Sequence, residues 1–273
     1  MRYAVLPYTV AGSRDGNVLK LAGRGAIVAG TRRIGGGIVE RLAREGVHVA
    51  VLFRSSNAAA ERQAESARQK GVKAIALQAD LTDEAQVARA VEQARQALGD
   101  VSFCINLAAD YPRAALEQLD AANWDAGLGA AKGTYLLATH AARAMSWNAG
   151  PTRGHLIFFG DWAAEETPYL DYLPYLTGKA AVHFMTRAFG LELASRGILV
   201  NAILPGPTEK PPDMSDHGWQ IALEQTPLGR ESSEEDIMEL IVTLLRLETI
   251  TGETIRVDSG RHLSGTARRR PAT

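Results

Sequence analysis

From residue 18 onward the sequence alternates between short, apolar, β-branched runs and longer stretches rich in Ala, Arg and Glu with a helical period. The runs that predict strands are residues 25–29, 47–53, 74–77, 101–106, 155–159, 198–203 and 254–257. The strand runs lack strict polar alternation, as expected when both faces of a sheet are covered. The pattern therefore predicts an α/β fold, in which a doubly wound sheet of seven mainly parallel strands carries helices on both faces.

The stretches between these runs predict helices. They are residues 34–45, 57–70, 83–98, 121–147, 174–195 and 233–247. Asn57 is predicted to cap the second helix. A Pro-rich segment after residue 203 predicts a loop.

The same alternation of strands and helices indicates how the chain is divided into domains. Because no linker interrupts it, we expect one domain over residues 18–264. Residues 1–17 are expected to be an N-terminal extension that includes a turn-forming cluster at residues 14–17. Residues 265–273 contain three consecutive arginines and a proline, and predict a flexible basic tail.

Charge and cysteine content exclude several classes of protein. Lys+Arg is 30 and Asp+Glu is 31, so the chain lacks the excess of basic residues that is typical of nucleic-acid-binding proteins. A single cysteine, Cys104, excludes an intramolecular disulfide and a Cys-rich zinc module, and His155 and His183 lack a second ligand at metal-binding spacing. Without a targeting or membrane-spanning stretch, we expect a cytoplasmic protein with a small-molecule substrate and no metal, membrane or nucleic-acid partner.

A glycine-rich turn follows the first predicted strand. It reads Gly30-Thr31-Arg32-Arg33-Ile34-Gly35-Gly36-Gly37. Such a turn between a strand and a helix lets backbone N–H groups approach a pyrophosphate at the helix N-terminus. The strand before it and the amphipathic helix after it favour a dinucleotide site over a merely structural turn. The residues from Gly30 to Gly35 are the candidate phosphate-binding residues.

The end of the second predicted strand indicates which dinucleotide binds. An NAD site usually places an acid there, to bind the ribose 2′-hydroxyl. The sequence instead reads Phe53-Arg54-Ser55-Ser56. Arg54, Arg32 and Arg33 are suited to a 2′-phosphate, with Ser55 as a further donor, unless these arginines are ordinary surface residues. The missing acid predicts NADPH as the cofactor.

Tyr175 and Lys179 lie at positions i and i+4 of a predicted helix, so they share one face of it. A positive charge close to a phenol stabilises its phenolate form and supports acid catalysis. The pair opens the helix after the fifth strand, where active sites of open α/β sheets collect. Tyr175 and Lys179 are therefore candidate catalytic residues.

Together these segments resemble the short-chain dehydrogenase/reductase family, over residues 18 to about 263. Besides the Gly-rich turn and the Tyr175–Lys179 pair, the matching segments are Asp80-Leu81, Asn106-Leu107-Ala108-Ala109 and Pro205-Gly206. The resemblance implies a single Rossmann-type domain that acts as an oxidoreductase. It also implies a homotetramer, because family members commonly pair the helices predicted at 121–147 and 174–195, which are rich in small residues.

The resemblance implies roles for individual residues. Tyr175 would protonate the substrate as hydride arrives, and Lys179 would hold the nicotinamide ribose and tune the tyrosine. The implied cofactor-binding residues further along the chain are Asp80 and Leu81 near the adenine, Asn106 and Ala108 near the adenosine ribose, and Pro205, Gly206 and Thr208 near the nicotinamide.

The sequence also departs from the family pattern. The Arg-Arg-Ile-Gly and Phe-Arg-Ser-Ser stretches are similar to those of the pteridine reductase branch, which uses NADPH. The catalytic serine that the family places 13 residues before the tyrosine is absent, and Asp161 stands 14 residues before it. Pteridine reductases also carry aspartate there. The family's active-site asparagine is replaced by Ala130 or Ala131, which puts the usual proton relay in doubt.

Asp161 is the third candidate catalytic residue. An ionised carboxylate accepts hydrogen bonds but donates none, so it suits a ring N–H better than a ketone oxygen. The alternative is that Asp161 only ends the fifth strand and points at solvent. Trp162, Tyr169 and Tyr172 follow it in the loop, and either line a flat substrate or pack the loop.

The sequence thus predicts an NADPH-dependent reductase with a pterin-like substrate. One alternative is a generic carbonyl reductase that acts on a keto group. The other is a nucleotide-binding homologue with weakened catalysis, favoured by the lost serine and asparagine.

Overall fold

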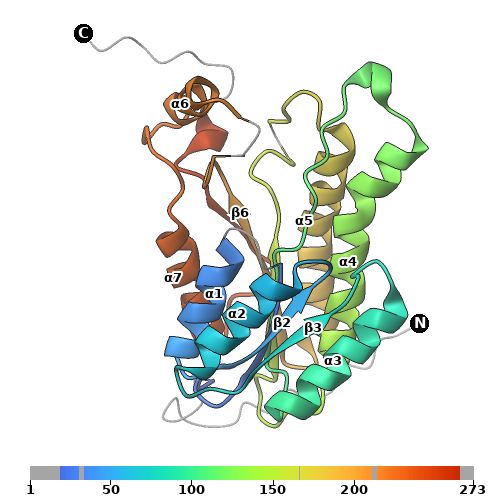
Figure 1. Cartoon of the computed structure of the whole chain (residues 1–273), viewed down its shortest axis with the longest axis vertical. Helices are drawn as coiled ribbons and strands as arrows, with labels where there is room; N and C mark the ends of the chain where they lie inside the picture. The colour runs from blue at the N-terminus through green and yellow to red at the C-terminus, as the bar shows by residue number, and fades with distance from the viewer. Residues whose placement is uncertain (1–18, 31–33, 166, 211–213, 265–273) are drawn as a thin grey trace, which may run out of the picture.

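The computed structural model describes residues 19–30, 34–165, 167–210 and 214–264. Within these residues, seven strands form one sheet in the order β3-β2-β1-β4-β5-β6-β7, and every neighbouring pair is parallel (Figure 1). The strands are β1 (Gly25–Ala29), β2 (His48–Phe53), β3 (Ala74–Gln78), β4 (Phe103–Asn106), β5 (Gly154–Phe159), β6 (Ile198–Pro205) and β7 (Thr254–Val257). The predicted fold class is confirmed.

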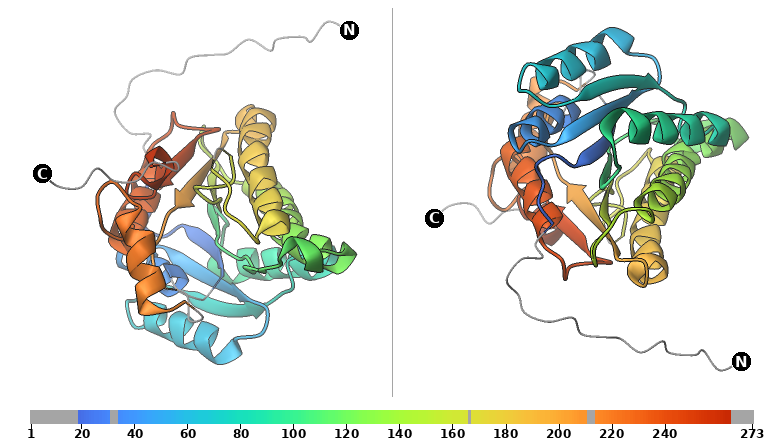
Figure 2. Two further views of the ribbon diagram at one scale, coloured as in Figure 1. Left: turned by 90° about the horizontal axis from the view of Figure 1, so that it is seen from above. Right: turned by 90° about the horizontal axis from the view of Figure 1, so that it is seen from below.

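Helices cover both faces of the sheet (Figure 2). They are α1 (Ile34–Arg44), α2 (Asn57–Arg68), α3 (Glu84–Leu98), α4 (Ala121–Met145), α5 (Leu173–Ala194), α6 (Asp216–Glu224) and α7 (Glu234–Arg246), with short 3-10 turns at η1 (Leu116–Gln118) and η2 (Arg261–Leu263). Helices α1, α2 and α7 pack on one face, and α3, α4 and α5 pack on the other.

Each of the strands β1 to β6 contributes side chains to both cores, which explains their continuous apolar runs in the sequence, whereas β7 contributes only to the core under α1, α2 and α7. In β1, Ile27 belongs to the core under α3, α4 and α5, whereas Val28 belongs to the core under α1, α2 and α7. Cys104 of β4 is buried in the first of these cores, and burial raises the pKa of its thiol to about 12. A thiol in this environment acts as an apolar core side chain.

Helices α4 and α5 approach each other closely, and glycines make this possible. A Cβ on Gly127 of α4 would overlap Pro174 of α5, and a Cβ on Gly178 of α5 would overlap the Gly127 carbonyl oxygen. The contact fixes the N-terminal half of α5 against α4. Tyr175 and Lys179 are therefore carried on a helix with little freedom to shift.

Three details of the secondary structure differ from the prediction. Asn57 is the first residue of α2, and the cap position is Ser56, whose side chain makes no capping hydrogen bond. Pro205 is the last residue of β6 and does not follow the strand. Helix α6 occupies part of the predicted Pro-rich loop, and Ser215 caps it by accepting from the Gly218 amide at 3.1 Å. None of the described α6 side chains is buried, so the helix leaves no apolar period in the sequence.

The predicted extension at residues 1–17 and the predicted tail at residues 265–273 lie outside the described residues. Among the residues that are described, no helix is long and apolar enough to span a membrane.

Two glycines of α4 test the close contact with α5. Gly127→Ala should lower the free energy of unfolding by about 1–3 kcal/mol, because the methyl group has no room against Pro174. Gly129→Ala is the matched control: its Cβ would meet Thr82 at 3.8 Å, so the better helix former should raise stability by up to about 1 kcal/mol. Urea denaturation followed by circular dichroism measures both, and equal effects of the two substitutions would contradict the packing argument.

Candidate active site

The parallel sheet gathers the sequence-predicted residues at one edge. Because all strands run the same way, their carboxyl ends meet at the same edge of the sheet. The candidate residues at or just beyond those ends are Gly30 after β1, Arg54 after β2, Asp80 after β3, Asn106 in β4, Asp161 after β5, and Pro205 and Gly206 at the end of β6. Thr31, Arg32 and Arg33 lie outside the described residues.

Gly30 and Gly35, on either side of the turn between β1 and α1, have no room for a side chain. Gly30 has φ of +101°, and a Cβ there would lie 2.9 Å from the Ala108 amide nitrogen. A Cβ on Gly35 would overlap the Gly30 carbonyl oxygen. Helix α1 begins at Ile34 without an acidic residue in its first turn, so the partial positive charge of its N-terminus is uncompensated there. These features fit the pyrophosphate of a dinucleotide, which needs close backbone approach and a helix N-terminus.

Sheet order places this turn at a topological switch point. Strand β1 lies between β2 and β4, so the chain leaves β1 in one direction along the sheet and returns to its other side. Ligands of open α/β sheets bind in the crevice at such a point. Gly30 after β1 and Ala108 after β4 come close together at this point.

Asn106 braces the end of β4. Its side-chain amide donates to Thr134 Oγ1 at 2.9 Å, and its side-chain oxygen accepts from the Ala108 amide at 3.1 Å. Thr134 in turn donates to the carbonyl of Ala130, one of the two residues that replace the expected asparagine. Ala131 is buried. The described geometry thus gives Asn106 a bracing role toward α4.

Asp80 and Leu81 form a tight turn after β3. Oδ1 of Asp80 accepts from the amide and the hydroxyl of Thr82, each at 2.8 Å. These hydrogen bonds lower the pKa of Asp80, the amide bond most strongly. Leu81 packs on α4, where a Cβ on Gly133 would lie 2.9 Å from the Leu81 Cβ.

Arg54 has an acidic partner that sequence reasoning missed. Its guanidinium binds both carboxylate oxygens of Asp110, at 3.0 and 3.1 Å. Both side chains are more than half exposed, and exposed ion pairs are weak, so a phosphate can compete for this arginine. Ser55 lies exposed beside it. Asp110 follows β4, 56 residues away in the sequence, so no local pattern indicates the pairing.

Asp161 contacts the candidate proton donor directly. Its Oδ2 accepts from the Tyr175 hydroxyl at 2.9 Å and from the Tyr169 hydroxyl at 3.2 Å. Its Oδ1 accepts from the Ala163 amide at 2.9 Å, and the residue is only 9% exposed. The alternative that Asp161 points at solvent is therefore wrong.

Lys179 lies buried behind Tyr175. Its ammonium donates to the Phe159 carbonyl at 2.7 Å and lies 5.7 Å from the centre of the Tyr175 ring. Burial lowers the pKa of Lys179 to about 8, and the Asp161 carboxylate opposes that shift. The helix thus brings a phenol and a buried amine to one face, as the spacing predicts.

Aromatic side chains surround Tyr175. Tyr111 meets its ring edge-on at 4.7 Å between centroids and stacks on Tyr172 at 4.3 Å. Tyr169 lies edge-on to Tyr172 at 5.1 Å and 6.2 Å from Trp162. Burial raises the pKa of Tyr111 and of Tyr169, and for Tyr169 the Asp161 charge adds to the effect. Tyr169 is therefore a neutral donor toward Asp161.

Sequence reasoning predicted the loop aromatics but not Tyr111. Tyr111 lies after β4 and reaches Tyr175 only through the fold, since 64 residues separate them. The aromatic contacts favour packing around Tyr175 as one role of this loop. They also leave Tyr111 43% exposed beside the candidate proton donor.

The segment after β6 closes the opposite side of this edge. A Cβ on Gly206 would lie 2.6 Å from the Asp258 Cα, so only glycine fits there. The Thr208 hydroxyl donates to the Gly206 carbonyl at 3.1 Å. No group of three or more His, Cys, Asp or Glu side chains suited to a metal ion occurs among the described residues.

Comparison with known proteins identifies the family of this chain. The family model for enoyl-(acyl carrier protein) reductase matches residues 28–262, which include the Gly-rich turn, Asp161, Tyr175 and Lys179. The chain belongs to the short-chain dehydrogenase/reductase family. It is an oxidoreductase of that family.

Relatives of this short-chain reductase resemble it over most of their length. The 3-oxoacyl-(acyl-carrier-protein) reductase FabG of Aquifex aeolicus is 29% identical over 251 residues, which cover 89% of this chain and 98% of the relative. A short-chain dehydrogenase from Burkholderia cenocepacia, solved in complex with NADP, has a TM-score of 0.81 at 28% identity, covering 89% of this chain and 99% of that one. FolM alternative dihydrofolate reductase 1 from Brucella canis, complexed with NADP, has a TM-score of 0.82 at 29% identity, covering 92% and 98%.

The buried lysine gives a prediction about stability and pH. Because folding lowers the Lys179 pKa from 10.5 to about 8, the unfolded chain binds more protons between these values, and stability rises with pH there. Relative to Lys179→Met, the wild-type free energy of unfolding should rise by about 2 kcal/mol between about pH 7.5 and 9.5.

Denaturant unfolding of both proteins across that range measures the difference. Lys132→Met, at an exposed position of α4, is the control and should differ from the wild type by a constant amount. A pH-independent difference for Lys179→Met would show that the ammonium is not desolvated on folding.

Proposed function

We propose that this short-chain reductase uses NADPH to reduce a pterin-like nitrogen heterocycle, with Tyr175 as the proton donor. The observation that carries the proposal is the 2.9 Å hydrogen bond from the Tyr175 hydroxyl to Asp161, a carboxylate where the family usually has a serine. Lys179 and Asp161 complete the proposed catalytic set.

NADPH is favoured by two independent observations. No acid follows β2, and Arg54 and Ser55 stand exposed where a 2′-phosphate would lie. Two structural relatives are described as NADP complexes. The proposed cofactor-binding residues are Gly30, Thr31, Arg32, Arg33, Ile34 and Gly35 for the phosphates, Asp80 and Leu81 for the adenine, Asn106, Ala108 and Lys179 for the riboses, and Pro205, Gly206 and Thr208 for the nicotinamide.

NADPH, when bound, supplies the hydride. When substrate binds, the Tyr175 hydroxyl turns from Asp161 and donates its proton to the substrate atom that gains negative charge as the hydride arrives. The phenolate that remains is stabilised by the ammonium of Lys179, which lies on the same face of α5. A proton from solvent restores the phenol.

The acceptor character of Asp161 favours a heterocycle. Its Oδ2 already collects two hydroxyl donors, and a substrate N–H or amino group can take the place of the longer one, from Tyr169. A ketone oxygen offers no donor, and a nearby carboxylate would repel it. The likeness to the Brucella canis FolM protein, described as an alternative dihydrofolate reductase, supports the same class of substrate.

A keto reductase is the second candidate. The likeness to the Aquifex aeolicus 3-oxoacyl reductase favours it, as does the retained pair of Tyr175 and Lys179. The same pair argues against a homologue with weakened catalysis.

We also propose a homotetramer assembled through α4 and α5. The small residues Ala138, Ala141 and Ala142 of α4 are buried within the chain itself, so the reason expected from the sequence is wrong for them. The outer faces instead expose large apolar side chains: Tyr135 of α4, and Phe184 and Leu191 of α5, are 52%, 64% and 81% exposed. Exposed apolar surface of this kind is typical of an interface between subunits.

Arg54 tests the choice of cofactor. The wild type should bind NADPH at least about tenfold more tightly than NADH, about 1.4 kcal/mol, and Arg54→Ser should remove most of that preference by weakening NADPH alone. Arg44→Ser is the control, because Arg44 is an exposed arginine of α1 that pairs with Glu40 at 2.8 Å. Titration calorimetry measures the dissociation constants of the three proteins for both cofactors, and equal values for NADPH and NADH in the wild type would refute the proposal.

Asp161 tests the substrate class. With 7,8-dihydrobiopterin as substrate, Asp161→Ser should lower kcat/KM by about tenfold or more, whereas reduction of acetoacetyl-coenzyme A should improve. Asp171→Asn, in the same loop and paired with Arg113 at 2.7 Å, should change neither activity. If Asp161→Ala leaves both activities at the wild-type level, the residue is not catalytic and the heterocycle proposal loses its main support.

A further inference from the structure

His183 shares a helix face with the two candidate catalytic residues of α5. Tyr175, Lys179 and His183 are spaced four residues apart, so they lie one above another on the helix. His183 is 1% exposed, and its Nε2 accepts the Asp161 amide at 3.2 Å. A Cβ on Gly160 would overlap the His183 imidazole, so only glycine fits at position 160, where the ring packs against the backbone before Asp161. The ring therefore supports the backbone on which the Asp161 carboxylate is mounted.

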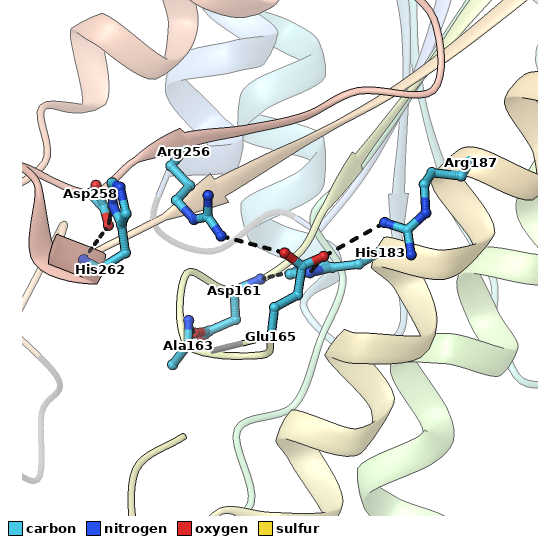
Figure 3. Close-up of polar contacts among 8 residues, drawn as sticks. All are labelled: Asp161, Ala163, Glu165, His183, Arg187, Arg256, Asp258 and His262. Atoms are coloured by element: carbon cyan, nitrogen blue, oxygen red, sulfur yellow. Dashed lines mark hydrogen bonds and ion pairs between the residues drawn. The ribbon is translucent and has the colours of Figure 1, made fainter. Parts of the chain in front are cut away.

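Glu165 holds the other side of the same ring (Figure 3). Its Oε1 lies 3.1 Å from His183 Nδ1 and 3.7 Å from an Arg187 guanidinium nitrogen, and its Oε2 lies 3.4 Å from Arg256. The two arginines come from α5 and β7, so Glu165 ties the loop after β5 to both elements. Because Nε2 accepts the Asp161 amide, the proton of the neutral ring stands on Nδ1, the nitrogen that faces Glu165.

We propose that His183 is a positioning residue for Asp161: as a neutral imidazole with its proton on Nδ1, it fixes the Asp161 backbone and so sets the carboxylate against Tyr175, while the Glu165 carboxylate lies beside Nδ1. The inference rests on the proposed role of Asp161. It adds a second layer to the site, in which the chain of contacts runs from Glu165 through His183 and Asp161 to the Tyr175 hydroxyl.

The charge state of His183 decides whether this contact exists. A proton on Nε2 would face the Asp161 N–H with a second donor, and the hydrogen bond would be lost. Burial lowers the pKa of His183, and the Lys179 charge lowers it further, whereas Glu165 and Asp161 raise it. Arg187 and Arg256 face the ring only across Glu165. Burial is the largest effect, and it keeps the neutral ring at neutral pH.

Two substitutions separate the two sides of the ring. The side-chain oxygen of His183→Gln can reach the position of Nε2 and accept the Asp161 amide, whereas the shorter His183→Asn reaches only the position of Nδ1, toward Glu165. The matched control is His155→Gln, since His155 is a buried histidine of β5 whose ring packs on Phe103 at 6.0 Å.

Hydrogen–deuterium exchange of the peptide spanning residues 159–165 reads the contact without a substrate. His183→Asn should speed exchange at this peptide, and His183→Gln and His155→Gln should leave it close to the wild-type rate. With NADPH and 7,8-dihydrobiopterin, His183→Asn should lower kcat by about tenfold or more and leave the KM for NADPH within about twofold, while His183→Gln stays within about threefold of the wild-type kcat. A general loss of packing would affect both variants. Wild-type-like exchange and turnover in His183→Gln but not in His183→Asn would therefore point to the lost hydrogen bond.

Wild-type exchange and wild-type kcat in His183→Asn would overturn the inference. If Asp161→Ala has no effect on turnover but His183→Asn still speeds exchange, the contact stands and the proposed role of Asp161 fails. If His183→Asn does not fold, nitrogen-15 NMR of the wild-type imidazole provides the test. An unprotonated Nε2 at pH 7 supports the inference, and a proton on Nε2 overturns it.

Discussion

The parallel direction of every strand is the constraint on which the site depends. A parallel sheet has two covered faces and a single edge where all strands end, so loops from β1 to β6 meet there although they are far apart in the sequence. The residues at this edge divide between two tasks. Gly30 and Gly35 keep both sides of the β1–α1 turn free of side chains, whereas the loop after β5 crowds a carboxylate and several phenols around Tyr175.

Burying the charged groups around Tyr175 lowers the stability of the folded chain. Lys179 is buried, and its ammonium donates to a backbone carbonyl. Asp161 is also buried and accepts hydrogen bonds from three donors. Buried charges destabilise a fold unless partners compensate them, and such arrangements are concentrated at active sites. The close packing of α4 and α5 supplies the rigid support that this arrangement needs.

Local patterns were sufficient for the sheet and for most helices. Apolar runs such as residues 25–29 coincide with β1, and the spacing of Tyr175 and Lys179 placed both on one face of α5. Helix α6 was missed because it buries no described side chain. Asp161 was identified through family resemblance, since only that resemblance relates a residue after β5 to a tyrosine 14 positions later.

The partners that complete the site could not be predicted in this way. Asp110 with Arg54, Tyr111 with Tyr175, and Glu165 with Arg256 are contacts between segments that only the folded chain brings together. Nothing in the sequence indicated a role for His183 beyond packing. The role proposed for His183 depends on the orientation of Nε2 toward the Asp161 amide, and the order of residues in the sequence does not show that orientation.

Tyr175→Phe tests whether Tyr175 gives the substrate its proton. The substitution removes one hydroxyl and keeps the ring that packs on Tyr111. If Tyr175 is the proton donor, kcat should fall by roughly 10²- to 10⁴-fold while the dissociation constant for NADPH stays within about threefold of the wild type. Turnover close to the wild-type rate in Tyr175→Phe, with 7,8-dihydrobiopterin or acetoacetyl-coenzyme A as substrate, would contradict that role.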